Sequence, residues 1–124
     1  MLRAISVVLL LTAPAALLAK ELYRAPSAGD SGTYYVLKRE KLDDAQFKVL
    51  ASRIGKGNAY TDFTELKINC KTKQYFELAG ASEDGKKEAP TAPLKDWSSR
   101  SKWTSLVTGS SKYDLVTHVC RKAS

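Results

Sequence analysis

Two cysteines, Cys70 and Cys120, constrain the fold of this 124-residue chain more than any other feature. Cys70 ends residues 64–70, where Leu66 and Ile68 alternate with charged and polar residues, as in a half-buried β-strand. A disulfide between the two cysteines would close a loop of about 51 residues and, by the chain-entropy argument, stabilise the fold by about 4 kcal/mol. We expect this intramolecular bond, with two free thiols or an intermolecular bridge as the alternatives.

The N-terminal residues 1–19 have the pattern of a secretory signal peptide. Arg3 precedes an apolar run, and cleavage after Ala19 would leave Leu17 and Ala19 at the positions that the signal peptidase inspects. An uncleaved membrane anchor is the alternative, but the apolar span is about 16 residues, whereas a membrane-spanning helix needs about 20. We therefore expect an exported protein with no stable membrane insertion after signal removal. An oxidising compartment would also favour the disulfide.

Residues 20–124 are enough for one small domain. They contain all eleven aromatic residues and carry a formal charge of +6, because the signal peptide takes one arginine and no acid from a chain of charge +7. Residues 20–32 are rich in Ser, Gly and Pro and lack periodicity, which predicts a flexible N-terminal arm. A single domain is then expected over residues 33–124, and a domain of this size is marginally stable without a cross-link.

The distribution of β-forming residues predicts a largely antiparallel sheet of about five strands. Phe63 and Leu66 have opposite parity within one strand, which predicts a bulge near Thr64. Residues 80–93 are polar and contain two prolines, so they predict an irregular loop. The clearest strand segments are residues 33–37, 60–70, 74–79 and 103–107.

Residues 42–54 fit two different structures. Asp43 as an N-cap, Gln46 in a capping box and apolar residues at helical spacing predict a short helix. The β-forming residues 47–50, followed by the turn-like residues 55–58, predict a strand and a hairpin instead. The residues by themselves leave both structures open.

The C-terminal segment predicts an amphipathic helix that packs on the sheet. Ser110 or Ser111 is the expected N-cap. The predicted fold class is therefore α+β, an antiparallel sheet packed against one C-terminal helix and clamped by the disulfide. The apolar stripe of the helix consists of Leu115, Val116, Val119 and Cys120.

The sequence shows no pattern typical of an enzyme or a metal site. The only histidine, His118, has no second imidazole or activated thiol to complete a nucleophile–base pair. Two cysteines and one histidine do not make a set of metal ligands. The acidic pairs at 43–44 and 83–84 lie in turn-like stretches, where carboxylates usually cap or face solvent. We therefore expect no enzymatic activity, no cofactor and no metal.

The positive charge is the one hint of function. A domain of charge +6 could bind a protein or a polyanionic surface, and a merely solvated surface is the alternative. Nucleic acid is not an expected partner, because the sequence shows neither a basic face interleaved with aromatic residues nor a suitable compartment. Trp103 is expected in the core. The candidate binding residues are Lys67, Lys71, Lys73, Trp97, Arg100 and Lys102.

The segment from Ser52 to Arg121 resembles the bacterial surface-adhesin protein E family. Thr108 stands where members often have a proline before Gly-Ser, and the N-terminal third has no clear counterpart. The matching residues are an aliphatic strand ending in Cys, a Trp segment, a Gly-Ser helix start and a C-terminal Cys. They are residues 52–55, Tyr60, residues 66–70, residues 74–76, Gly85, residues 103–106, residues 109–110 and residues 119–121.

The resemblance implies a disulfide-clamped sheet with a C-terminal helix, exported to the periplasm or cell surface of a proteobacterium. It also favours the strand over the helix for residues 42–54. Characterised members are adhesins that bind host matrix and plasma proteins, while most relatives have no known role. We therefore expect a non-enzymatic, adhesin E-like binding protein of the bacterial envelope that engages a protein or polyanionic partner. The alternative is a periplasmic inhibitor or accessory protein of an envelope system. The ligand and the oligomeric state do not follow from the sequence.

Overall fold

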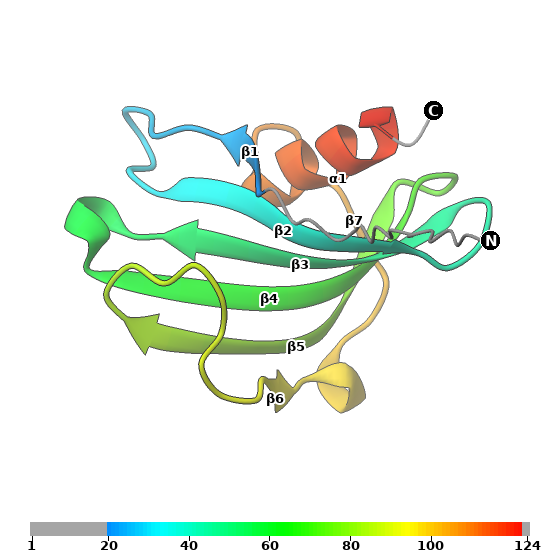
Figure 1. The fold of residues 1–124 in the computed structure, drawn as a ribbon. Coiled ribbons are helices and arrows are strands. Elements are labelled where there is room, and N and C mark those ends of the chain that lie inside the picture. The colour runs from blue at the N-terminus through cyan, green and yellow to red at the C-terminus, as the bar shows by residue number, and fades with distance from the viewer. Residues whose placement is uncertain (1–19, 123–124) are drawn as a thin grey trace, which may run out of the picture.

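The computed structural model describes residues 20–122 and shows an antiparallel sheet with one helix, α1, on one of its faces (Figure 1). The strand order β1-β2-β3-β4-β5-β6 follows the chain, and β7 also pairs with β5. The predicted signal peptide lies outside the described residues. The elements are β1 (Glu21–Arg24), β2 (Thr33–Lys41), β3 (Gln46–Ile54), η1 (Lys56–Asn58), β4 (Tyr60–Asn69), β5 (Gln74–Asp84), β6 (Lys95–Asp96), η2 (Ser98–Arg100), β7 (Thr104–Ser105) and α1 (Ser111–Lys122).

The predicted fold class is confirmed, since the sheet is antiparallel and the C-terminal helix packs on it. The sheet has seven strands where about five were expected. β7 lies within the predicted strand segment 103–107. The additional strands β1 and β6 have four and two residues and lie along the edges of the sheet. Elements this short leave no periodic pattern in the sequence, which is why they were not predicted.

Residues 46–54 form strand β3, so the favoured prediction is confirmed. The carboxylate of Asp43 accepts hydrogen bonds from the backbone N–H groups of Ala45 and Gln46, both at 2.8 Å. Asp43 therefore closes the turn between β2 and β3 rather than capping a helix. β3 pairs along its whole length with both β2 and β4. These two ladders satisfy its backbone groups, and the marginal stability of a short isolated helix cannot compete with them.

The main core lies between α1 and the face of the sheet that α1 covers. Leu66 and Ile68 of β4 are fully buried there, together with Leu115, Val116 and Val119 of α1. Complete burial of such a side chain contributes about 1.5–3 kcal/mol. The predicted alternation of β4 and the predicted apolar stripe of α1 are therefore both confirmed.

A disulfide joins Cys70, after the end of β4, to Cys120 in α1, with the two Cα atoms 5.5 Å apart. The predicted intramolecular pairing is confirmed and uses both cysteines of the chain. At the other end of α1, the backbone N–H of Tyr113 donates to Ser110 Oγ at 3.1 Å. Ser110 is thus the N-cap of the helix, and the hydroxyl of Ser111 is not used for capping.

Residues 20–32 belong to the domain, so the prediction of a flexible arm that precedes it is wrong. β1 lies within this segment and pairs antiparallel with β2. Arg24 of β1 forms an ion pair with Asp114 at 3.1 Å, and Glu21 lies 2.8 Å from His118. The partners that hold β1 are in β2 and α1. Local sequence could not identify them because α1 is about 90 residues away along the chain.

The irregularity predicted near Thr64 lies in the neighbouring strand. The pairing of β4 with β5 shifts by one residue at Leu78, so the bulge belongs to β5, whereas β4 pairs with β3 without a shift. Phe63 has the opposite parity from the core residues simply because it points to the other face of the sheet. Residues 80–84, predicted as the start of a loop, continue β5 as strand.

Each face of the sheet is covered along only part of its length. α1 has 12 residues and is about 18 Å long, whereas the ten residues of β4 span about 33 Å. On the α1 side of β4, Leu66 is fully buried but Asp62 is partly exposed. On the opposite face, called the outer face below, Phe63 is buried but Lys67 is partly exposed. The two uncovered areas therefore lie on opposite faces and at opposite ends of the sheet.

The segment between β5 and β6 covers the end of the outer face at which Thr61 lies (Figure 1). The hydroxyl of Thr61 donates to the carbonyl of Gly85 at 2.7 Å and accepts the backbone N–H of Lys87 at 2.9 Å. An ion pair between Lys20 and Glu88, at 2.8 Å, ties the same segment to the chain just before β1. The outer face is thereby left open only toward the end that carries the disulfide.

Candidate functional site

The open half of the outer face carries lysines and aromatic residues from five adjacent segments. Lys48 of β3 pairs directly opposite Lys67 of β4, and Lys67 pairs opposite Phe76 of β5. Lys38 of β2 pairs opposite Leu50, the next residue of β3 on the same face after Lys48. Trp103 packs on Phe76 with ring centroids 5.7 Å apart. We call this surface the basic face, defined by Lys38, Lys48, Lys67, Phe76 and Trp103.

Lys67 is held by the two aromatic rings of the basic face. Its Nζ lies 5.3 Å from the ring centroid of Phe76 and 5.6 Å from that of Trp103. Each contact of this kind contributes about 0.5–1 kcal/mol at an exposed site. Lys48 stands directly across from Lys67, and like charges in this position destabilise a sheet. Neither lysine forms an ion pair with another residue in the described range 20–122.

Two acidic residues lie within the same open area. Glu40 pairs opposite Lys48 across β2 and β3, and Glu65 of β4 lies in the row next to Lys67. Neither carboxylate is within ion-pair distance of a lysine of the basic face in residues 20–122. The two glutamates reduce the positive charge of this area but do not cancel it.

Three of the predicted binding residues belong to this end of the molecule. Lys67 lies on the basic face, and Lys71 and Lys73 are exposed in the adjoining turn between β4 and β5. The side chain of Asn69 shapes this turn by accepting the backbone N–H groups of Lys71 and Thr72 at 2.9 and 3.0 Å. The charge of the turn therefore continues the charge of the basic face.

The other predicted residues lie on the α1 side. The ring of Trp97 packs on Gly80, which pairs opposite Thr64 in β4. Arg100 and Lys102 line a shallow cavity of about 210 Å³ next to the helix side of β5. The predicted set thus divides between two faces, because the segment from η2 to β7 wraps around the edge of β5.

Four residues of the basic face, Lys38, Lys48, Phe76 and Trp103, were not in the predicted set. Trp103 was expected in the core, but it is partly exposed and packs on the outer face. Lys38 and Lys48 were not singled out. If residues 46–54 are taken as a strand, the alternation with Phe47 and Val49 places Lys48 on the face away from the core. The register that brings it against Lys67 is a property of the paired strands alone.

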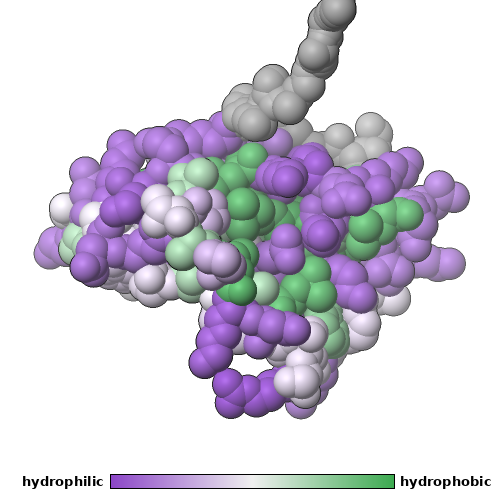
Figure 2. Space-filling model, turned by 60° about the horizontal axis from the view of Figure 1, so that its bottom comes forward, coloured by the Kyte–Doolittle hydropathy of each residue, from purple (hydrophilic) through white to green (hydrophobic). Residues whose placement is uncertain are grey.

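An apolar groove of about 400 Å³ adjoins the basic face. Leu37, Leu50 and Ala89 line it, and Lys38 is shared with the basic face. Figure 2, which views the molecule from the side away from α1, shows several separate apolar patches among hydrophilic side chains. The open outer face is therefore mixed in character, with apolar surface beside the lysines.

On the α1 side, Arg53 anchors a polar network at the end of the sheet that α1 leaves open. Its guanidinium donates to Asp30 at 3.0 Å, to the hydroxyl of Tyr34 at 2.8 Å and to the hydroxyl of Tyr60. Hydrogen bonds from Tyr34, from the backbone of Gly32 and from Arg53 hold the pKa of Asp30 well below its usual range. The bond to Asp30 raises the pKa of Arg53, so the pair is charged at neutral pH.

The single histidine takes part in a structural cluster. His118 Nε2 lies 2.8 Å from Glu21 Oε1, and Arg39 donates to the same oxygen at 2.7 Å. Burial by itself would raise the pKa of Glu21, but the hydrogen bonds from His118 and Arg39 bring the pKa below its ordinary value. The cluster ties β1 and β2 to α1.

Within residues 20–122, no group of three or more His, Cys, Asp or Glu side chains is placed to hold a metal ion. In the same range, no helix has the length and apolar character needed to cross a membrane. The disulfide is consistent with an oxidising compartment outside the cytoplasm. Comparisons of the chain with protein-family models, with curated proteins and with solved structures found no match.

Proposed function

We propose that this protein is a non-enzymatic binding protein of the bacterial envelope that engages a polyanionic partner through the basic face. The observation that carries the proposal is the cross-strand pair of Lys48 and Lys67, whose ammonium groups have no acidic partner in residues 20–122. Facing lysines repel each other, and an anion bound between them would relieve the repulsion.

The spacing of the lysines suits an extended anionic chain. Lys38, Lys48 and Lys67 lie on three consecutive strands, which are about 4.8 Å apart. A polyanion that crosses the strands would meet one lysine on each of them and then reach the exposed turn with Lys71 and Lys73. Phe76 and Trp103 would form the floor beside it.

Further support comes from the sequence. The signal-peptide pattern and the disulfide agree with export, and the resemblance to the surface-adhesin protein E family favours a binding role in the periplasm or at the cell surface. The charges of His118's partner Glu21 and of Arg53 are paired within the protein, whereas the lysines of the basic face keep charges that are unpaired in residues 20–122 for a large charged partner.

The test is the retention of the oxidised, exported protein on an immobilised sulfated polysaccharide. The double variant Lys48→Gln/Lys67→Gln should elute at clearly lower salt than the wild type, because two contacts of a salt-sensitive surface are lost. The matched control is Lys56→Gln/Lys95→Gln, which removes the same charge from exposed residues elsewhere.

Equal shifts for the two double variants would show that net charge alone causes retention, and the proposal would be wrong. Retention of the wild type on immobilised polyglutamate but not on the polysaccharide would redirect the proposal to an acidic protein partner.

A further inference from the structure

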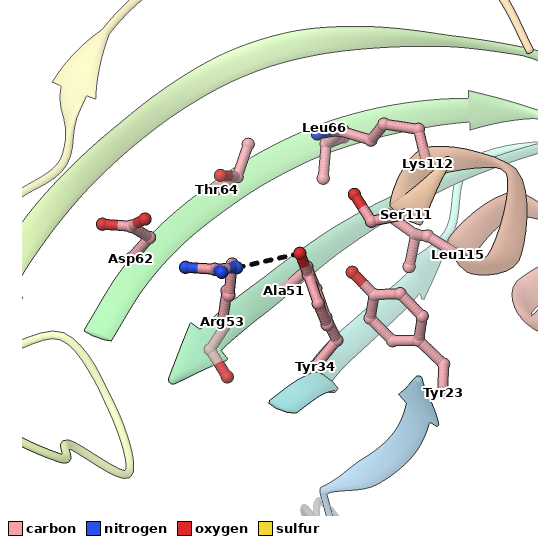
Figure 3. A pocket seen from close by; sticks show the side chains of 11 residues that line it. Tyr23, Tyr34, Ala51, Arg53, Asp62, Thr64, Leu66, Ser111, Lys112 and Leu115 are labelled. Carbon is pink, nitrogen blue, oxygen red and sulfur yellow. Dashed lines mark hydrogen bonds between the residues drawn. The ribbon is translucent and has the colours of Figure 1, made fainter. Parts of the chain in front are cut away.

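We propose that the pocket between α1 and the open end of the sheet binds one uncharged sugar ring. Figure 3 shows this pocket, a cavity of about 150 Å³ on the face opposite the basic face. Strands β1 to β4 and the first residues of α1 all contribute to its lining. It is separate from the surface assigned to the polyanion, so it would take a second ligand.

Three hydroxyl groups in the lining have no hydrogen-bond partner in the part of the chain that the structure describes. Tyr23, Thr64 and Ser111 line the pocket (Figure 3). Their hydroxyl groups form no hydrogen bond with another residue in the range 20–122. Ser111 is free because Ser110 caps α1. Burial raises the pKa of Tyr23 above its usual range, so its hydroxyl stays protonated and can donate.

The charged groups of the pocket favour a ligand without net charge. Arg53 is paired with Asp30 at 3.0 Å, and Lys112 with Glu77 at 3.5 Å. Asp62 lines the same pocket and accepts the hydroxyl of Ser82 at 2.6 Å. Asp62 would repel an anion, and Arg53 and Lys112 would repel a cation. An uncharged ligand avoids both repulsions and can still use these groups as donors and acceptors.

The donors and acceptors match a ring that carries several hydroxyl groups. Arg53 has five N–H donors, of which three are used by Asp30, Tyr34 and Tyr60. The remaining N–H groups of Arg53 can donate, and the Asp62 carboxylate can accept. The hydroxyl groups of Thr64 and Ser111 can do both. Sugar hydroxyl groups also donate and accept, so they can pair with every one of these groups.

The size and floor of the pocket also fit a single ring. A cavity of about 150 Å³ can hold the six-membered ring itself, since an engineered cavity of that volume binds benzene, while the outer hydroxyl groups of a sugar would extend from the pocket mouth. Ala51, Leu66 and Leu115 supply an apolar part of the lining, against which the C–H groups of a ring can pack. The ring could be a free monosaccharide or the terminal unit of a glycan, since both present the same groups.

The test is an NMR titration of the exported, oxidised protein with glucose, galactose and mannose and with their methyl glycosides. The amide signals of residues 51–53, 62–66 and 111–112 should shift and saturate in the millimolar range for at least one of these sugars. Binding of methyl glycosides as well as free sugars would indicate the terminal unit of a glycan. Binding of free sugars alone would indicate a free monosaccharide.

Three variants test the hydroxyl groups with little change of shape, namely Tyr23→Phe, Thr64→Val and Ser111→Ala. Each should weaken binding by about fivefold, the loss of one ordinary hydrogen bond, and the triple variant by more. The matched control is Tyr113→Phe/Thr117→Val, which removes exposed hydroxyl groups from the same helix and should leave binding unchanged. Thermal melts of each variant establish that the fold is kept, and the single variants suffice if the triple variant unfolds.

Absence of shifts at the pocket with all six sugars would overturn the proposal, as would unchanged affinity in the folded hydroxyl variants. Stronger shifts of the same amides by acetate or by ethylammonium would also overturn it, because the ligand would then be charged. The variant Lys48→Gln/Lys67→Gln should keep the sugar response, since those lysines lie on the other face.

Discussion

At the scale of single residues, Gly80 shows how one position decides the packing at the β5 edge. A Cβ atom at residue 80 would overlap Cη2 of Trp97, well inside the distance that two non-bonded carbon atoms keep. The absence of a side chain therefore lets the indole cover the strand. Gly80 is buried in a strand interior, where glycine is otherwise unfavourable, so close packing of this ring explains its presence.

We predict that Gly80→Ala destabilises the protein by about 1–3 kcal/mol, the usual cost of overpacking. The measurement is the free energy of unfolding from urea denaturation. Gly29→Ala is the control, because nothing lies within 4 Å of a Cβ atom there, and it should be close to neutral. Equal losses in the two variants would mean that the indole does not pack on residue 80 as described.

Asp30 makes the free energy of unfolding depend on pH. Its pKa is lowered in the folded protein by hydrogen bonds from Tyr34, Gly32 and Arg53. The unfolded chain, with an ordinary pKa of about 3.9, therefore takes up a proton first as the pH falls. The stabilisation from Asp30 is complete well above this value and is lost progressively as the pH falls below it.

We expect the free energy of unfolding of the wild type to fall more steeply than that of Asp30→Asn between about pH 5 and pH 3. Urea denaturation at a series of pH values measures this slope. Asp44→Asn serves as the control, since Asp44 is exposed in a turn and forms no ion pair with another described residue. A slope for Asp30→Asn that equals the wild-type slope would contradict the assigned network.

At the scale of elements, the disulfide joins the two parts that build the core. β4 is a central strand that contributes the fully buried Leu66 and Ile68 to the core on the α1 side, and α1 is the only α-helix in residues 20–122. Cys70 follows β4 directly, and Cys120 lies within the last turns of α1. The bond therefore holds the C-terminal part of α1 against the end of β4.

We predict that Cys70→Ala, Cys120→Ala and the double variant lose similar stability, about 4 kcal/mol for a closed loop of this length. The losses should be similar because each change opens the same loop. Reversible urea denaturation of the three proteins and of the reduced wild type measures the effect. Strongly unequal losses would indicate that one of the cysteines has a role besides this bond.

At the scale of the whole molecule, the two uncovered areas of the sheet separate two kinds of surface. The basic face lies on the outer face near the disulfide, and the polar pocket (Figure 3) lies on the α1 side at the opposite end. On the α1 side this separation follows from length, because α1 is shorter than a strand of about 33 Å, and on the outer face the segment between β5 and β6 is tied to the end that carries Thr61. The two proposed ligands would therefore not compete for the same residues.

Much of the fold follows from local sequence patterns. The alternation around Leu66 and Ile68 predicts β4, and the apolar stripe with Ser110 as a cap predicts α1. The pairing of Cys70 with Cys120 follows from there being two cysteines in a chain that begins with a signal-peptide pattern. These features depend on neighbours a few residues apart or on composition, and such information is present in the sequence alone.

Long-range pairing decided the remaining features. Residues 46–54 became strand rather than helix because β2 and β4 both pair with them, and β1 is a strand because its partners lie in β2 and α1. The sequence by itself marked Lys67 as a candidate, but it did not join it to Lys48 and Trp103. Which side chains share a face is set by strand register, and register depends on contacts between segments that are distant in the chain. The sequence by itself therefore determined the core elements and the covalent link, while only the tertiary structure decided which residues form each surface.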